Sequence, residues 1–136
     1  GVGQDIHFVI PKLVDHFRRR APVIELGNMD VAREFNDVRM VCSAYRLLLE
    51  HGVPGETYNV CSGRAYSLHQ VLDQLSALTG HRPEIQINPA FVRSHEVKHL
   101  CGDPKRLHHL EQGLEGGQLP SYSLTDTLAT MLAASS

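Results

Sequence analysis

Charged and amide side chains that suit a phosphorylated ligand stand where the expected helices and strands of this chain meet loops. They are Lys12, Asn28, Arg33, Arg64, Arg93 and Glu96. A guanidinium group can hold two phosphate oxygens at once, so arginines in such places suit a diphosphate. A carboxylate such as that of Glu96 suits the hydroxyl groups of a ribose. Spacing alone also fits a solvated charged surface, and it leaves both interpretations open.

Metal binding and nucleophilic catalysis have weaker support in the sequence than binding of a phosphorylated ligand. Nine histidines are present, but His95 and His99 fall in a stretch expected to be loop and strand, where a spacing of four does not converge on a metal. No CxxC or HExxH pattern occurs, so we expect no metal site. Cys61 alternates with core positions at the end of an expected strand and has no evident base beside it. We therefore expect a buried, inert thiol there.

The chain also lacks the motifs that hold a nicotinamide dinucleotide. The run Gly1-Val2-Gly3 does not continue as GxGxxG, and no strand precedes it. None of the four tyrosines is followed four residues later by a lysine, so the Tyr-x-x-x-Lys pair of nicotinamide-dependent reductases is absent. We expect this chain alone to bind no such cofactor.

Length and charge restrict the class of protein. The 136 residues, 42% of them hydrophobic, suit one globular domain. A formal charge of −2 disfavours binding to nucleic acid or to an acidic membrane. No apolar run approaches the roughly 20 residues of a membrane span, and no export signal pattern opens the chain. The three cysteines form no disulfide pattern, so we expect reduced thiols in the cytoplasm.

Hydrophobic periodicity predicts five helices. The first begins near Ile10 with Pro11 in its first turn, where a missing N–H has little effect. Asp37 is expected to cap the second helix, which the cluster 51–55 ends. The third follows Ser67, which fits a capping box with Gln70. A short helix is expected to start at 103–104 and a last one after the cap Ser123.

Alternating or β-branched runs predict the strands. The expected ranges are 23–26, 32–36, 56–61, 84–88 and 97–101. The order is then α-β-β-α-β-α-β-β-α-α, which favours the α/β class, although no complete doubly wound sheet results.

The same segments resemble a known family. The ordered motifs are Gly1-Val2-Gly3-Gln4, 26–30 (LGNMD), 33–39 (REFNDVR), 58–63 (YNVCSG), 93–97 (RSHEV) and 102–105 (GDPK). Together they are similar to the C-terminal part of extended short-chain dehydrogenase/reductases that act on nucleotide sugars. The branch that they resemble most handles GDP-mannose and its 4-keto-6-deoxy product.

This resemblance implies an α/β, Rossmann-type fold whose nucleotide-binding half is missing from the chain. Residues 1–136 would be the sugar-nucleotide-binding portion, with about 31–61 packed on the absent dinucleotide-binding sheet. The complete enzyme would use NADP(H) and form a homodimer or tetramer. In the family, arginines at the positions of Arg33 and Arg93 approach the diphosphate, and Glu96 reaches the ribose. Lys12, Asn28 and, less closely, Arg64 would also adjoin the GDP moiety.

The resemblance implies one of two reactions, GDP-mannose 4,6-dehydration or reduction of the GDP-4-keto-6-deoxymannose product, in deoxyhexose biosynthesis. The "YNVCSG" and "FNDVR" stretches lean toward the reductase. The groups that transfer protons would lie upstream of this chain, which would orient the substrate and be inactive alone. A non-catalytic nucleotide-binding or assembly module of the same fold is the alternative, and an α/β domain without a ligand is a third interpretation.

Overall fold

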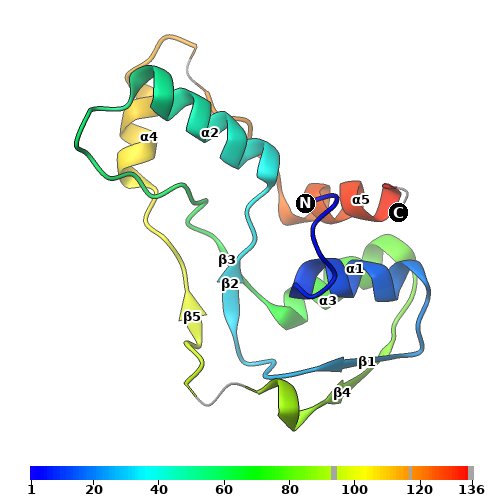
Figure 1. The fold of residues 1–136 in the computed structure, drawn as a ribbon. Helices are drawn as coiled ribbons and strands as arrows, with labels where there is room; N and C mark the ends of the chain where they lie inside the picture. The colour runs from blue at the N-terminus through cyan, green and yellow to red at the C-terminus, as the bar shows by residue number, and fades with distance from the viewer. Residues whose placement is uncertain (93–94, 117, 135–136) are drawn as a thin grey trace.

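The structure is a computed structural model that describes residues 1–92, 95–116 and 118–134. It is a mixed α/β fold with two small sheets, as Figure 1 shows. In chain order the elements are α1 (Val9–Arg18), β1 (Val23–Leu26), β2 (Ala32–Glu34), α2 (Val38–His51), β3 (Ala65–Ser67), α3 (Leu68–Thr79), β4 (Glu84–Ile87), the 3-10 turn η1 (Pro89–Phe91), β5 (His99–Leu100), α4 (Lys105–Gln112) and α5 (Leu124–Ala133). The predicted α/β class and the order of helices and strands are confirmed.

Helices α1, α3 and α5 pack against one another and against the parallel pair β1–β4, and we call these five elements the core lobe (Figure 1). Its most deeply buried side chains come from every helix and from β1. They are Leu13, Phe17, Ile24, Val71, Leu75 and Leu128. Burial of these large apolar groups is the main source of stability in this part of the chain.

The helix ends of the core lobe follow the local signals. Ser67 accepts a hydrogen bond from the Gln70 N–H while the Gln70 side chain accepts one from the Ser67 N–H, which confirms the predicted capping box. Gly80 ends α3 in the left-handed conformation with φ of 65°, which glycine adopts without strain. Ser123 caps α5 in the same reciprocal way with Asp126.

The second sheet joins three short strands in the order β3-β2-β5. Strand β2 runs antiparallel to β3 and parallel to β5, so Arg33 lies opposite both Tyr66 and Leu100. Because side chains alternate across a strand, Arg33 and Glu34 project to opposite faces of this sheet.

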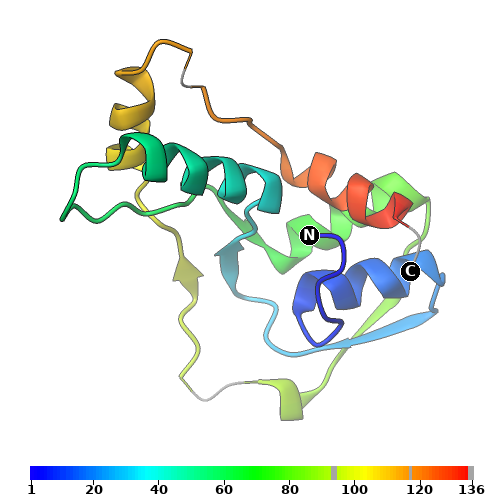
Figure 2. The same ribbon diagram turned by 45° about the horizontal axis from the view of Figure 1, so that its top comes forward.

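Helices α2 and α4, with the connecting residues 52–64, stand away from the core lobe, and we call them the arm (Figures 1 and 2). Ala44 is the only residue of α2 that is buried. On the same helix Leu49 is 88% exposed and Tyr45 is 59% exposed. The apolar stripe that identifies α2 in the sequence therefore faces outward in this chain.

A buried carboxylate ties the arm to the core lobe. Asp37, predicted as the cap of α2, accepts hydrogen bonds from the Arg39 N–H and from both ends of the Arg39 guanidinium. It also accepts one at 2.7 Å from the Thr127 hydroxyl on α5. The hydrogen bonds from Arg39, followed by the one from Thr127, outweigh burial and hold the pKa of Asp37 far below its usual value.

Two local predictions are wrong. Residues 56–61 form no strand, and β3 lies later, at Ala65–Ser67. In the described part of the chain these residues pair with no other strand; the Asn59 amide instead donates to the Asp103 carbonyl at 3.2 Å. A strand needs a partner for its backbone groups, so alternation is not sufficient.

The start of α4 is also shifted. The helix begins at Lys105, one residue after the predicted first position, and Pro104 precedes it. Asp103 still accepts a hydrogen bond from the Lys105 N–H at 3.0 Å. Its side chain therefore satisfies a backbone donor at the start of α4, although Asp103 lies one residue before the N-cap Pro104. Strands β2 and β5 are shorter than the predicted ranges 32–36 and 97–101. No helix among the described residues is long and apolar enough to cross a membrane.

Candidate functional site: a cavity beside strand β1

A cavity of about 840 Å³ opens between α1, the turn after β1, β2 and η1. Four of the six residues predicted from the sequence line it: Lys12, Asn28, Arg33 and Glu96. They come from a helix, a turn, a strand and a loop. Lys12 and Glu96, the first and last of them, are 84 positions apart in the sequence. The tertiary structure thus gathers them around one space.

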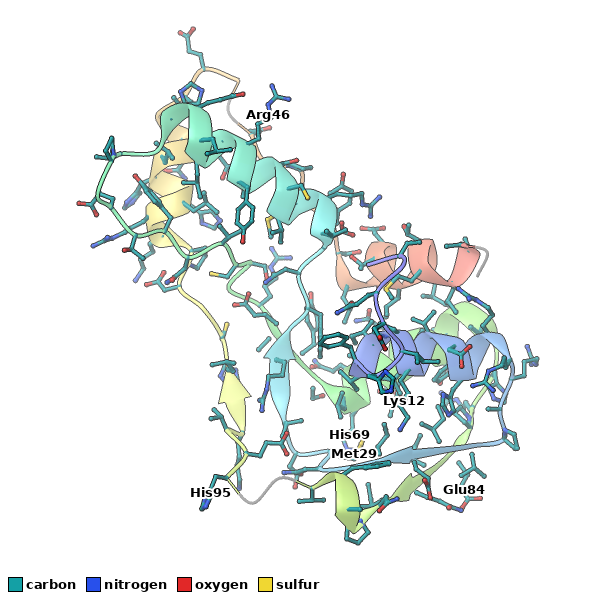
Figure 3. The ribbon with its side chains drawn as sticks, viewed as in Figure 1. Lys12, Met29, Arg46, His69, Glu84 and His95 are labelled. Atoms are coloured by element: carbon teal, nitrogen blue, oxygen red, sulfur yellow. The ribbon has the colours of Figure 1, made fainter. Side chains whose placement is uncertain are left out.

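Lys12 projects from α1 toward β1, and Figure 3 shows it on that side of the helix, with Met29 near the end of the strand. Its ammonium donates a hydrogen bond to the Glu25 carbonyl at 2.8 Å. It also lies 4.7 Å from the centre of the Phe91 ring. Both contacts hold the positive charge at the cavity without neutralising it.

Asn28 is fixed by the turn that follows β1. Its side-chain oxygen accepts a hydrogen bond from the Asp30 N–H at 2.9 Å, an arrangement typical of asparagine in turns. The side-chain NH₂ group has no hydrogen bond among those resolved within the described residues. It is a donor that a phosphate or hydroxyl oxygen in the cavity can use.

Arg33 is the central cation of the site. One guanidinium nitrogen donates to the carbonyl oxygens of Ala32 (2.9 Å) and Lys98 (3.4 Å). The other terminal nitrogen lies 3.7 Å from the Glu96 carboxylate, and the two side chains are only 25% and 21% exposed. The guanidinium is therefore held in place before any ligand binds, which lowers the entropy lost on binding.

Glu34, on the opposite face of β2, anchors the strand that carries Arg33. Its carboxylate accepts hydrogen bonds from the N–H groups of Ser62 (3.0 Å) and Gly102 (2.7 Å), from the Cys101 thiol and from the Asn36 amide. Burial opposes its ionisation, but these hydrogen bonds prevail and lower the pKa of Glu34. The loops before β3 and after β5 are thereby fastened to β2.

The surroundings of Glu34 disfavour the ionised form of two thiols, Cys61 and Cys101. Burial, together with the charge of Glu34, raises the pKa of Cys61. The hydrogen bond to Glu34 is the main cause of the raised pKa of Cys101. A thiol with a raised pKa carries little thiolate at neutral pH. Cys61 is partly buried, so the prediction of a fully buried thiol is wrong, and its inertness stays a prediction.

The remaining predicted residues lie elsewhere. Arg64 is exposed and lines a separate cavity of about 200 Å³ between the arm and the core lobe, together with Cys61, His108 and Tyr122. The structure therefore does not bring Arg64 to the cavity that holds Arg33. Arg93 lies outside the described residues.

The cavity also contains residues that the sequence analysis did not select. Phe8, His16, Gly27 and Phe91 line it. Phe91 follows the Asn88-Pro89 pair, a turn signal directly after a strand. That signal marks the end of β4, but it does not reveal that η1 folds back against the turn after β1.

Comparison with known proteins identifies the family. Residues 2–112, more than half of the chain, match the family described as GDP-mannose 4,6 dehydratase. The chain belongs to this family. The resemblance inferred from the sequence motifs is thus confirmed.

Two curated relatives belong to the same group of sugar-nucleotide enzymes. The chain is 37% identical over 107 residues to GDP-6-deoxy-D-talose 4-dehydrogenase from Aggregatibacter actinomycetemcomitans, a match that covers 79% of this chain and 36% of the relative. It is 33% identical over 138 aligned positions to GDP-6-deoxy-D-mannose reductase from Pseudomonas aeruginosa, covering 98% of this chain and 44% of the relative. The chain therefore spans less than half the length of either protein.

A solved structure shows the same fold. The structure of RMD from Pseudomonas aeruginosa complexed with NADPH superposes with a TM-score of 0.85 at 32% identity, over 98% of this chain and 44% of that one. The predicted fold, a Rossmann-type α/β fold of the extended short-chain dehydrogenase class, is confirmed.

The residues of this chain do not fit a dinucleotide site of their own. Among the described residues β2 leads to α2 through Phe35-Asn36-Asp37, β3 runs directly into α3, and β5 leads to α4 through Cys101-Gly102-Asp103-Pro104. None of these connections has the spaced glycines that let a backbone approach a pyrophosphate. Asp103, whose pKa is lowered chiefly by its hydrogen bond from the Lys105 N–H, places a negative charge at the start of α4.

Proposed function

We propose that this chain is the substrate-binding part of an NADP-dependent enzyme that modifies GDP-sugars in deoxyhexose biosynthesis. The observation that carries the proposal is the meeting of Lys12, Asn28, Arg33 and Glu96 around one cavity. Two cations, an amide and a carboxylate on a partly apolar surface match the charges and hydroxyl groups of a nucleoside diphosphate.

Each of these side chains has a role in this proposal. Arg33 binds the diphosphate through its guanidinium, which Glu96 and two carbonyl oxygens already orient. Asn28 donates to a ligand oxygen, and Glu96 accepts hydrogen bonds from the ribose hydroxyls. Lys12 adds positive charge beside β1. Arg93 remains a predicted diphosphate ligand.

The reaction that we propose is hydride transfer at C4 of a GDP-6-deoxyhexose, the reductase side of the two reactions implied by the sequence. Support comes from the names of both relatives, a 4-dehydrogenase and a reductase of GDP-6-deoxy sugars. NADP(H), bound by another part of the enzyme, would supply or accept the hydride. This chain would contribute binding energy at the nucleotide, which holds the sugar in position.

We also propose that residues 31–61 pack on the dinucleotide-binding sheet. The outward stripe of α2, with Leu49 and Tyr45 exposed, supports this arrangement because monomeric proteins seldom leave such a helix face in water. The cytoplasm is the proposed compartment, supported by Cys42, Cys61 and Cys101, which are all free thiols.

Calorimetric titration of the full-length protein with GDP tests the binding site. Because Arg33 makes charge-assisted contacts, Arg33→Ala should raise the Kd for GDP about 10- to 100-fold. Arg33→Lys, which keeps the charge but loses the guanidinium geometry, should give an intermediate loss. Arg64→Ala is the matched control, since it removes the same charge from a different cavity. Equal effects of Arg33→Ala and Arg64→Ala would refute the assigned site.

The reaction is tested separately. Consumption of NADPH with GDP-4-keto-6-deoxymannose identifies the reductase. Loss of one water in mass from GDP-mannose identifies the dehydratase. Tight binding of GDP without either reaction would instead support a non-catalytic nucleotide-binding module.

A further inference from the structure

Two chain segments that each carry a thiol meet at the carboxylate of Glu34, and the proposed function uses neither thiol. The Cys101 thiol donates a hydrogen bond to Glu34 Oε1 at 3.2 Å. The N–H of the next residue, Gly102, donates to the same oxygen at 2.7 Å. The N–H of Ser62, which follows Cys61, donates to Glu34 Oε2 at 3.0 Å. Glu34 thus holds together the segment that contains Cys61 and the segment that contains Cys101.

The Cys61 side chain packs directly on Gly102. A Cβ atom at Gly102 would lie 2.6 Å from the Cys61 sulfur, 3.0 Å from the Cys61 Cβ and 3.7 Å from Glu34 Oε1. A side chain at position 102 would therefore push the Cys61 thiol away from the backbone that follows Cys101. The charge of Cys61 is also one cause of the raised pKa of Cys101, so the two thiols are within electrostatic reach of each other.

Both thiols are able to react and to move. Cys101 is exposed and Cys61 is partly buried. The Cys61 sulfur lies 3.8 Å from the Asn59 carbonyl oxygen, and a thiol is only a weak hydrogen-bond donor. Two cysteines form a disulfide when their Cα atoms lie within about 7 Å and their side chains turn toward each other. Contact of Cys61 with the residue next to Cys101 suits this requirement.

We propose that Cys61 and Cys101 are a site of reversible oxidation and form a disulfide that fastens the two segments at Glu34. The oxidant is a small disulfide such as glutathione disulfide. This inference is independent of the proposed function, and it departs from the inert thiol that the sequence predicts at Cys61. Disulfides of reducing compartments are typically transient and respond to the redox state.

The exchange takes place in two steps. The thiolate of the exposed Cys101 attacks one sulfur of glutathione disulfide, forms a mixed disulfide and releases one glutathione thiolate. The Cys61 thiolate then attacks the Cys101 sulfur and releases the second glutathione thiolate. Two protein thiols lose two electrons and two protons, and one glutathione disulfide is reduced to two glutathione thiols. Because both thiols carry little thiolate at neutral pH, the pair responds to sustained rather than brief oxidation.

The disulfide would take over the task of Glu34. It joins residues 40 positions apart in the sequence, next to Ser62 and Gly102, whose N–H groups bind the carboxylate. A link between distant residues stabilises the fold mainly by restricting the unfolded chain. The oxidised protein should therefore keep these segments together even when the carboxylate is removed.

Peptide mapping of the full-length protein tests the disulfide. The protein is incubated with glutathione disulfide, the remaining thiols are alkylated, and the digest is analysed by mass spectrometry. We expect one pair of peptides joined through Cys61 and Cys101, two hydrogens lighter than the separate peptides and separated by dithiothreitol. A lasting mixed disulfide of Cys101 with glutathione, without the joined pair, overturns the proposal.

Cys42 supplies the matched control, since it is an exposed thiol on α2. Cys42→Ser should form the joined pair at the rate of the parent protein. Cys61→Ser lacks the second attacking thiol and should stop at the mixed disulfide of Cys101. Cys101→Ser should form no joined pair. Joining of Cys42 to Cys61 or Cys101 in the parent protein would show unspecific oxidation and overturn the proposal.

Thermal unfolding tests the shared task of the disulfide and Glu34. In the reduced protein Glu34→Ala should lower the unfolding temperature, because the Ser62 and Gly102 N–H groups lose their acceptor. In the oxidised protein the same substitution should lower it less. Glu34→Gln, which keeps one acceptor oxygen, is the milder variant and should show the same difference at smaller size. Equal decreases in the reduced and oxidised proteins would overturn the fastening role.

Discussion

The core lobe and the arm are stabilised by different interactions. In the core lobe, three helices and a strand pair bury large side chains such as Phe17 and Leu75 completely. In the arm, Ala44 and Leu107 are the buried residues of α2 and α4, and polar links to Asp37 and Glu34 supply much of the attachment. The core lobe has its own hydrophobic core, whereas the arm has an apolar face without a partner in this chain.

This difference matters for the candidate site because the cavity lies between the core lobe and strand β2 of the second sheet, and its lining includes no residue of the arm among the described residues. Lys12, Gly27 and Phe91 belong to the core lobe or its turns, and Arg33 lies on β2. The end of the cavity beside Lys12 and Phe91 is thus supported by a hydrophobic core, while the strand that carries Arg33 depends on the Glu34 hydrogen bonds. Four substitutions in the full-length protein test the comparison, measured as changes in the free energy of unfolding by chemical denaturation.

The largest effect is expected in the core lobe. Phe17 is 1% exposed and packs among the helices that cover β1 and β4. Phe17→Ala removes a large buried group and leaves a cavity, so it should reduce stability by about 3–5 kcal/mol. The exposed Leu78→Ala on α3, at 39% exposure, is the control and should change stability by less than about 1 kcal/mol. Similar losses in the two variants would contradict the assigned core.

The second-largest loss of stability is expected at Asp37, which links the arm to the core lobe. Asp37→Ala removes the acceptor of the Arg39 guanidinium and breaks the bond from Thr127, whose hydroxyl keeps only the Ser123 carbonyl at 3.2 Å, and we expect a loss of about 3 kcal/mol. Because the folded-state pKa of Asp37 lies below its unfolded value of 3.8, its contribution is present above about pH 4 and is lost as the pH falls further. The parent protein should lose stability in that acid range more steeply than Asp37→Ala. Parallel pH profiles of the two proteins would exclude this role.

A substitution on the outward face of α2 should change stability less than Asp37→Ala, but it tests whether this face is buried in the full-length protein. Leu49 is 88% exposed in this chain, so Leu49→Ala would have almost no effect if the face stayed in water. Packing of α2 on a dinucleotide-binding sheet would bury Leu49, and the loss would then be about 2 kcal/mol. Arg46→Ala on the same helix, which breaks only an exposed pair with Glu50, should change stability by less than about 0.5 kcal/mol. A Leu49 effect as small as that of Arg46 would argue against docking of this face.

The smallest effect concerns a helix end. Ser123 caps α5 through the Asp126 N–H, and Ser123→Ala should reduce stability by about 1 kcal/mol. Ser123→Asp, which keeps a capping acceptor, should retain most of the stability. Ser121→Ala is the control, since Ser121 is exposed and has no hydrogen bond among the described residues. If Ser123→Ala is as stable as Ser121→Ala, the cap contributes nothing.

Local signals predicted the helices well. The capping residues Asp37, Ser67 and Ser123 and the terminating Gly80 act within three or four residues of the helix ends, so the chain segment itself contains both partners. The strand predicted at 56–61 failed because pairing needs a second segment. Arg64 reaches a cavity formed with the arm rather than the one that Arg33 lines, and its predicted contact with the GDP moiety stays a prediction.

The candidate site was accessible to sequence reasoning only in part. Lys12, Asn28, Arg33 and Glu96 could be selected because their side chains suit a phosphate or a ribose and because the motifs around them resemble a family; their spacing alone also fits a solvated surface. Phe91 could not be selected in this way. An aromatic residue after a strand is usually part of a core, whereas here η1 packs closely against Gly27 and Phe91 lines the cavity.

The order of residues determined which segments form helices, where those helices begin and end, and which side chains are chemically suited to a nucleotide. These properties depend on neighbours a few positions apart and on the chemistry of single side chains. The folded chain decided that Lys12, Arg33 and Glu96 share one cavity, that Arg64 does not, and that the α2 stripe faces outward. Those outcomes depend on contacts between segments tens of residues apart, which are selected by the burial of apolar surface over the whole chain.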